Sequence, residues 1–246
     1  MLSRISVRIA SQGVACVNNL MLGPCTCIGG GSDYMIDDRL QVRYTPYHFH
    51  HRTEVSGFMS ILHGDNRFYN NIFVQHWPVE HEEPVMEPGF DVYLNERVGT
   101  EIFNDYMTYE EWISQFDFTK RPDMLALMNI HYRRLPVWIE GNAYFSGARA
   151  FKKEKHNLVC DDEDVYVRVK EADGTFVLET NLYEKLGKFK DGIICTETLG
   201  KAFEPEEAFE NPDGTPIQFD TDYFGNHRGI SAVPGPFAEG KSVYAL

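Results

Sequence analysis

Short apolar runs that begin at asparagine recur along the first 150 residues. They read ACVNNLMLG at 15–23, NRFYNNIFV at 66–74 and WIEGNAYFSG at 138–147. Asparagine is a poor strand former and favours turns, so a chain turn is expected just before each run. Asn19, Asn71 and Asn142 occupy the same place in these imperfect repeats. Self-similarity of this kind is typical of a solenoid.

A parallel β-helix accounts for this pattern. Its coils consist of short strands joined by tight turns, where asparagine tolerates left-handed backbone angles. Stacked asparagine amides can also hydrogen-bond to one another along the solenoid. The repeats are irregularly spaced, so long loops must leave the coils, and such insertions often gather on the binding face. The alternative is three unrelated strands, each preceded by a turn-forming asparagine.

Several further elements are predicted within the first 150 residues. Near the N-terminus, Ile5, Val7 and Ile9 alternate with polar residues, which favours a strand; the Ser- and Arg-rich composition also resembles a transit peptide. FDVYL at 90–94 has a strand-like composition. In TYEEWISQF at 108–116, Thr108 and Glu111 form a capping box that predicts a helix. A second helix is expected in PDMLALMNIHYRRL at 122–135.

The sequence pattern changes after residue 150, where the asparagine repeats give way to a hairpin pattern. DVYVRVKEADGTFVLETNL at 164–182 places Val165, Val167 and Val169 on one face and predicts a hairpin that turns at Asp173-Gly174. The expected organisation is therefore a parallel β-helix over 1–150, with an insertion at 75–135 that carries one or two short helices. A β-rich appendage over 151–246 would pack on the solenoid or cap it.

Charge and cysteine content narrow the function classes. The formal net charge is −14, which would repel nucleic acid and anionic membranes. No apolar run approaches the length of a membrane span, and the compartment stays open because no secretory signal is recognisable. Five cysteines do not make a disulfide framework, and Cys25 and Cys27 are expected in a buried strand. The glycine triplet Gly29–Gly31 lacks the spacing of a dinucleotide loop, so no cofactor is expected.

Six motifs occur in an order that resembles a known family. They are TPYHFHHRTEVSGF (45–58), GDNRFYNNIFV (64–74), PVWIEGNAYFSGA (136–148), TETLGKAF (196–203), FENPDGTPIQFDTDYFGNHRG (209–229) and PGPF (234–237). Together they resemble the C-terminal part of the right-handed β-helix glycoside hydrolases of the family-120 β-xylosidase type. The resemblance implies retaining hydrolysis of xylo-oligosaccharides by two carboxyl groups about 5 Å apart.

The resemblance also implies that the catalytic pair is missing. In that family the pair lies upstream of the segment matched by residues 1–23, so we expect a C-terminal portion that lacks it. Such a portion would pair with the missing N-terminal coils or self-associate through its exposed sheet edge. Within the chain itself, Glu54 and Asp65 are the first candidates for catalytic carboxylates. A non-catalytic carbohydrate-binding or structural module stays open, as does a polysaccharide lyase, although the negative charge disfavours the lyase.

Candidate sugar contacts lie in two of the motifs. His48 and His51 match family positions and could line a sugar cleft or serve a structural role, and Tyr47 beside them could stack on a sugar. Arg67 is the remaining candidate, and its pairing with Asp65 could instead stabilise a turn. If the strand continued through 48–51, His48 and His50 would share one face and His51 would point away. No fourth metal ligand is apparent, so no metal site is expected.

Four further residues have a structural interpretation as well as a functional one. Trp77 and Trp138 could be sugar platforms, with Trp138 more typical of the core. Asp220 and Asp222 resemble calcium ligands only superficially, because the remaining ligands are missing, and they are expected to order a loop.

Overall fold

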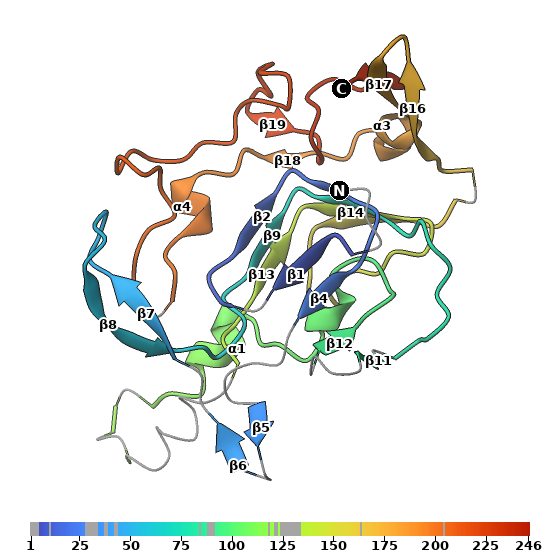
Figure 1. Ribbon diagram of the computed structural model, residues 1–246. Helices are drawn as coiled ribbons and strands as arrows, with labels where there is room; N and C mark the ends of the chain where they lie inside the picture. The colour runs from blue at the N-terminus through green and yellow to red at the C-terminus, as the bar shows by residue number, and fades with distance from the viewer. Residues whose placement is uncertain are drawn as a thin grey trace.

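The structure is a computed structural model that describes most of the chain. The described residues are 5–9, 11–27, 34–36, 39–41, 44–83, 85–87, 92–117, 119–120, 123, 134–162, 164–203 and 205–246. The architecture is mostly β with a few short helices, which agrees with the all-β class (Figure 1). Parallel and antiparallel sheets are mixed. Among the described residues, no helix is long and apolar enough to cross a membrane.

Two parallel sheets form the centre of the molecule. The first contains β2 (Ala15–Val17), β9 (Arg67–Tyr69) and β13 (Trp138–Glu140); the second contains β3 (Leu20–Met21), β10 (Ile72–Val74), β14 (Asn142–Phe145) and β15 (Asn157–Cys160). Each asparagine repeat of the sequence therefore contributes one strand to each sheet. In Figure 1, β2, β9 and β13 run side by side, with β14 behind them.

Equivalent residues of the repeats lie on top of one another. The register aligns Cys16 with Phe68 and Phe68 with Ile139 in the first sheet, and Met21 with Phe73 and Phe73 with Tyr144 in the second. These six side chains are buried in one cluster between the sheets. The rings of Phe73 and Tyr144 stack with centroids 5.2 Å apart. The short apolar runs thus supply the core because every coil delivers the same inward positions.

The asparagines form the predicted ladder at the corner between the sheets. Asn71 Oδ1 accepts hydrogen bonds from the backbone N and Nδ2 of Asn19, at 2.9 and 3.0 Å. Asn142 Oδ1 accepts the same two bonds from Asn71, again at 2.9 and 3.0 Å. The left-handed backbone angles fall one residue earlier, on Asn18 (φ 56°), Asn70 (φ 55°) and Gly141 (φ 73°). One residue of each pair therefore makes the corner, and the next forms the ladder.

The C-terminal part covers the outer faces of both sheets. It contains an antiparallel sheet of β16 (Val167–Ala172), β17 (Thr175–Thr180) and β20 (Val243–Ala245), and the helix α3 (Leu182–Leu186). Leu178 and Tyr244 from this sheet share a buried cluster with Ile72. Farther along the chain, Ile194 and Leu199 pack on Tyr69 of the first sheet. The central strands are consequently buried on both faces, as is usual for parallel sheets.

Smaller elements surround this centre. They are the parallel pair β1 (Val7–Ile9) and β4 (Cys25–Cys27); the antiparallel pairs β5 (Tyr34–Ile36) and β6 (Arg39–Gln41), β7 (Tyr44–His48) and β8 (Val55–Ser60), β11 (Val85–Glu87) and β12 (Val92–Leu94), and β18 (Asp191–Gly192) and β19 (Ser231–Ala232); the 3₁₀ turn η2 (Glu101–Phe103); and the helices α1 (Tyr109–Ile113) and α4 (Thr196–Leu199). The hairpin β7–β8 and the helix α4 lie to one side of the first sheet (Figure 1).

Most local predictions are confirmed. The N-terminal strand exists as β1 and buries Ile9. Thr108 and Glu111 cap α1 reciprocally. The Asp173-Gly174 turn joins β16 and β17, and both of its residues have positive φ. Cys25 is buried in β4, and Asp222 orders its loop by accepting bonds from the backbone N of Phe224, Asn226 and Ala238.

The valines placed on one face differ in burial: Val167 lies in the core, whereas Val169 is exposed. Other predictions lie outside the described residues. Gly29–Gly31 and most of the predicted helix at 122–135 lie outside the described residues.

Candidate functional site

An aromatic pocket lies between α1, β13 and the segment that contains α4. Its volume is about 320 Å³, at the lower end of the range of ligand pockets. The lining residues are Arg67, Tyr109, Trp138, Thr198, Leu199, Gly200, Lys201, Ala202, Phe203 and Glu206. Tyr109 and Trp138 stack with centroids 6.1 Å apart and an interplanar angle of 26°. The pocket therefore combines an aromatic wall with a cationic and an anionic side chain, Lys201 and Glu206.

Three chain segments bring these residues together. Tyr109 is the first residue of α1, whose capping box fixes the start of the helix. Trp112 of the same helix packs edge-on against Phe203, with centroids 4.6 Å apart. Trp138 is the first residue of β13 and pairs in register with Arg67 of β9. The helix of the 75–135 insertion thus contributes directly to the pocket wall.

Arg67 anchors the pocket from within the fold. Its side chain is buried, with Nε donating to Leu199 O at 2.8 Å and Nη2 donating to Lys201 O at 2.6 Å. Its guanidinium lies between the rings of Trp138 and Phe209, 4.2 and 4.5 Å from their centroids. Such sandwiched guanidinium contacts are favourable when desolvated. Arg67 therefore joins a central coil to the C-terminal segment across the pocket wall.

The two candidate catalytic carboxylates are each engaged by an arginine. Asp65 is buried: its Oδ1 pairs with Arg67 at 2.5 Å, and its Oδ2 accepts a bond from Phe203 N at 2.8 Å. Burial raises the pKa of Asp65, and the charge of Arg67 opposes that rise. Glu54 is exposed and pairs with Arg52 at 2.6 Å; this hydrogen bond lowers the pKa of Glu54. Neither carboxylate lines the aromatic pocket.

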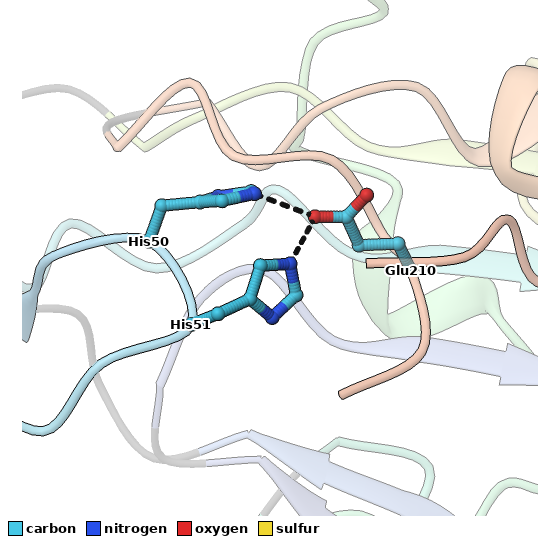
Figure 2. A group of neighbouring side chains, drawn as sticks. All are labelled: His50, His51 and Glu210. Carbon is cyan, nitrogen blue, oxygen red and sulfur yellow. Dashed lines mark hydrogen bonds and ion pairs between the residues drawn. The ribbon is translucent and has the colours of Figure 1, made fainter. Parts of the chain in front are cut away.

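His50 and His51 lie at the tip of the β7–β8 hairpin. The predicted strand alternation, in which His48 and His50 share one face and His51 points away, is wrong. The strand β7 ends at His48, and Arg52 N donates to Phe49 O at 2.9 Å, which closes a turn. His51 has a left-handed φ of 52°. Because the chain bends here, His50 and His51 both reach Glu210 (Figure 2), with Nε2 atoms 2.9 and 2.7 Å from its Oε1.

Tyr47 and His48 remain on the strand side of the turn. His48 Nδ1 lies 2.9 Å from Thr53 O, and Tyr47 lies across Gly57 of β8. A Cβ at Gly57 would fall 2.9 Å from the Tyr47 hydroxyl. Of the four expected sugar contacts, only Arg67 is therefore part of the pocket lining.

Residues 198–210 connect the pocket with the histidines. Glu206 lines the pocket, whereas the next residue, Glu207, contacts His50 Nδ1. Ala202 N donates to Glu207 O at 2.7 Å, which holds this segment in a narrow loop. The sequence reasoning missed Glu207 and Glu210. Glu207 lies only in the acid-rich stretch FEPEEAFENPD at 203–213, and Glu210 lies also in the motif at 209–229, but neither signal connects them with the histidines.

Trp77 and Trp138 have different surroundings. Trp138 is partly covered and belongs to the pocket wall, so it is more than the core residue that its place in a repeat suggested. Trp77 is 46% exposed and lies edge-on to His76. Tyr109 was predicted only as part of a helix, because nothing in the sequence indicates which side of α1 faces β13.

A solved structure resembles nearly the whole chain. It is the complex of XylC with xylose, which matches 97% of this chain at 30% sequence identity with a TM-score of 0.73. This chain spans about a third of the length of XylC, 33%. The similarity supports a relationship with a xylan-related family. No family model matches the sequence, and no curated protein does.

Proposed function

We propose that this chain is part of a glycoside hydrolase of the β-xylosidase type that acts on xylo-oligosaccharides. The observation that carries the proposal is the 30% identity to XylC over 97% of the chain, together with the xylose in that complex. The ordered motifs of the sequence point to the same class. The chain spans a third of XylC, and its ordered motifs resemble the C-terminal part of the family, so we further propose that it corresponds to a C-terminal portion without the catalytic carboxylate pair.

We also propose that the two parallel sheets are sides of one right-handed parallel β-helix. Three repeats each contribute a strand to both sheets, and the asparagine ladder runs through the shared corner. Connections between parallel strands of a sheet are almost always right-handed. The open edges at β2 and β3 would then be where further coils continue the solenoid.

The aromatic pocket is the proposed sugar site. A β-xylopyranose carries equatorial hydroxyls and no exocyclic carbon, so its axial C–H bonds can pack on the rings of Tyr109 and Trp138. Lys201 and Glu206 would bond to the hydroxyls at the rim. Tyr47 and His48 are proposed contacts on the hairpin side. His51 is implied by the same family resemblance, but its Nε2 already lies against Glu210.

A non-catalytic sugar-binding role is the second candidate. It is favoured by the contacts of Glu54 and Asp65. The hydrogen bond from Arg52 lowers the pKa of the exposed Glu54, which disfavours it as a proton donor. Asp65 is buried, with its two oxygens engaged by Arg67 and Phe203 N. Under either candidate, this chain alone binds the sugar and does not hydrolyse it.

Xylobiose titration and aryl β-xyloside hydrolysis test the proposal together. We expect saturable xylobiose binding that weakens at least tenfold in Tyr109→Ala. Phe176→Ala is the matched control, because Phe176 is an exposed aromatic on β17, outside the pocket; its binding should equal that of the wild type. Absence of binding would overturn the sugar site. Hydrolysis that disappears in Glu54→Gln or Asp65→Asn would overturn the view that the chain lacks its catalytic pair.

A further inference from the structure

Four side chains converge at the tip of the β7–β8 hairpin, outside the aromatic pocket. This His–Glu cluster consists of His50, His51, Glu207 and Glu210. Glu210 Oε1 lies 2.9 Å from His50 Nε2 and 2.7 Å from His51 Nε2 (Figure 2). Glu207 contacts the other nitrogen of His50, Nδ1. The cluster joins a hairpin and a C-terminal loop that are more than 150 residues apart in the chain.

The two carboxylates beside the His50 ring favour a cation at the cluster. A neutral imidazole carries one N–H, so only one of its two nitrogens can donate a hydrogen bond. Both nitrogens of His50 face carboxylate oxygens, and one of them must therefore point a lone pair at an anion. A second proton on His50 would remove this repulsion, and so would a metal ion. His51 Nε2 adds a third electron-pair donor at the same place.

We propose that the His–Glu cluster binds a zinc ion through His50 Nε2, His51 Nε2 and a Glu210 oxygen. Two imidazoles and one carboxylate are a ligand set that zinc uses in proteins, with a water in the fourth position. Glu207 would then hold the Nδ1–H of His50. A carboxylate that accepts this bond fixes the ring and its tautomer and strengthens the other nitrogen as a ligand.

The distances suit a small tetrahedral ion. Ligand atoms of His50, His51 and Glu210 lie within 4.8 Å of one another. Zinc bonds of about 2.0–2.2 Å place tetrahedral ligands about 3.3 Å apart, so the cluster needs to open by only about half an ångström. The side chains of His50 and His51 are 54% and 30% exposed, which lets an ion enter and leaves the fourth position to water.

The backbone on both sides orients the ligands. His51 is in the left-handed region, which is costly for a histidine and is found mainly where the surroundings impose it. Glu210 pairs with Pro216 across a tight turn, in which Asn211 N donates to Thr215 O at 2.9 Å. The protein also carries a net charge of −14, which favours cation binding. Bound zinc would fasten the β7–β8 hairpin to the 207–216 segment.

Zinc titration of the chelator-treated chain tests the inference. We expect one zinc ion per chain by calorimetry, and a Co²⁺ derivative with the absorption of a tetrahedral site. Affinity should fall at least tenfold in His50→Ala and in Glu210→Gln. Glu207→Gln should lose about 10–100-fold, as expected for a residue that positions a ligand. His156→Ala is the matched control, because its ring lies against Lys190 O and Phe189, outside the cluster; its zinc affinity should stay within twofold of wild type.

Two outcomes would overturn the zinc site. One is a wild-type chain that takes up no zinc, which would leave the four side chains as a hydrogen-bonded group without a metal. The other is zinc uptake that Glu210→Gln and His50→Ala leave unchanged, which would place the ion elsewhere. Circular dichroism of each variant confirms folding, and Glu210→Gln, which preserves volume, decides the test if His50→Ala does not fold. Xylobiose binding is measured separately, so failure of the proposed sugar site is distinguishable.

Discussion

The asparagine ladder and the His–Glu cluster are both polar groups that join distant parts of the chain, but they are built in opposite ways. The ladder repeats one residue type at one corner, buries Asn71 and Asn142, and links each asparagine to the next through hydrogen bonds to its Oδ1. The cluster uses four residues from two unrepeated loops and is partly exposed. Repetition therefore specifies the scaffold, whereas the candidate sites depend on single contacts between loops.

The end of the ladder sharpens this contrast. Glu154 takes the place of a fourth asparagine: its Oε1 accepts the bonds from Asn142 N and Nδ2, at 3.1 and 2.9 Å. Asn157 is the residue aligned with Asn142 in the sheet register, yet its Nδ2 bonds to Glu154 O. Tyr144 donates to Glu154 Oε2 at 2.7 Å. The repeat thus stops at a buried carboxyl group that can titrate.

The largest effect is expected inside the ladder. Asn71→Ala removes the acceptor of two Asn19 bonds and two donor bonds, to Asn142 Oδ1 and Cys16 O. Each buried group left unpaired costs about 1–3 kcal/mol, so we expect a loss of roughly 3–5 kcal/mol in the free energy of unfolding. Asn19→Ala, at the open end, removes only donor bonds and should cost about 1 kcal/mol. If Asn71→Ala and Asn19→Ala lowered the free energy of unfolding equally in urea denaturation, Asn71 would not be the buried centre of the ladder.

The next effect is pH-dependent and concerns Glu154. Burial raises its pKa from 4.5 to about 7. A carboxyl whose folded pKa lies above its unfolded value stabilises the fold at low pH, and that stability is lost as the pH rises through about 7. We expect this group to lower the free energy of unfolding by roughly 2–3 kcal/mol between pH 5 and pH 8.

Glu154→Gln isolates that contribution. Glutamine can still accept from Asn142 and can donate to Tyr144, but it does not titrate. The stability difference between wild type and variant should therefore change by the same amount between pH 5 and pH 8. Parallel pH profiles for the two proteins would show that Glu154 titrates normally.

An effect of similar size, independent of pH, is expected at the ladder corner. Gly141 has a φ of 73°, and a Cβ there would lie 2.4 Å from both Asn70 Oδ1 and Asp191 Oδ2. Gly141→Ala should cost about 2–3 kcal/mol, from the left-handed backbone and the clash together. Gly147 also has positive φ, but nothing lies within 4 Å of its Cβ position, so Gly147→Ala should cost about 1 kcal/mol. If Gly141→Ala and Gly147→Ala had the same urea midpoint, the close contacts at Gly141 would not contribute to stability.

The smallest effect is expected on the site side. Thr108→Ala breaks the capping box of α1, which should cost about 1 kcal/mol and loosen Tyr109 at the pocket. Thr108→Ser keeps the hydroxyl and should restore both stability and xylobiose affinity. If Thr108→Ala lowers stability without changing xylobiose affinity, α1 has no part in the sugar site.

The same contrast explains what the sequence could predict. Asn19, Asn71 and Asn142 are visible as a repeat, and a repeat implies stacking without any knowledge of long-range contacts. The capping box of α1 and the Asp173-Gly174 turn are local signals, so they were also predictable. Glu207 and Glu210 were not, since nothing local connects them to histidines 157 and 159 residues away. The strand alternation predicted over 48–51 fails because the chain turns after His48. That turn depends on backbone hydrogen bonds between Phe49, Arg52 and Glu54.

The pocket was missed for the same reason. Tyr109 and Trp138 meet only once α1 packs against the C-terminal segment through Phe203. Trp138 belongs both to a repeat and to the pocket, and only its place in the repeat could be recognised from the sequence. Arg67 was correctly singled out, but its burial and its contacts with Leu199 and Lys201 make it an anchor of the wall.

The indole N–H resonances of the three tryptophans test the central claim most directly. Trp138 lines the proposed sugar site, whereas Trp77 and Trp112 do not; the Trp138 signal can be assigned with Trp138→Phe. On titration with xylobiose, we predict a saturable shift of the Trp138 indole signal, with the Trp77 signal unchanged. A shift confined to Trp77, or no shift at saturating xylobiose, would contradict the assignment of this pocket as the sugar site.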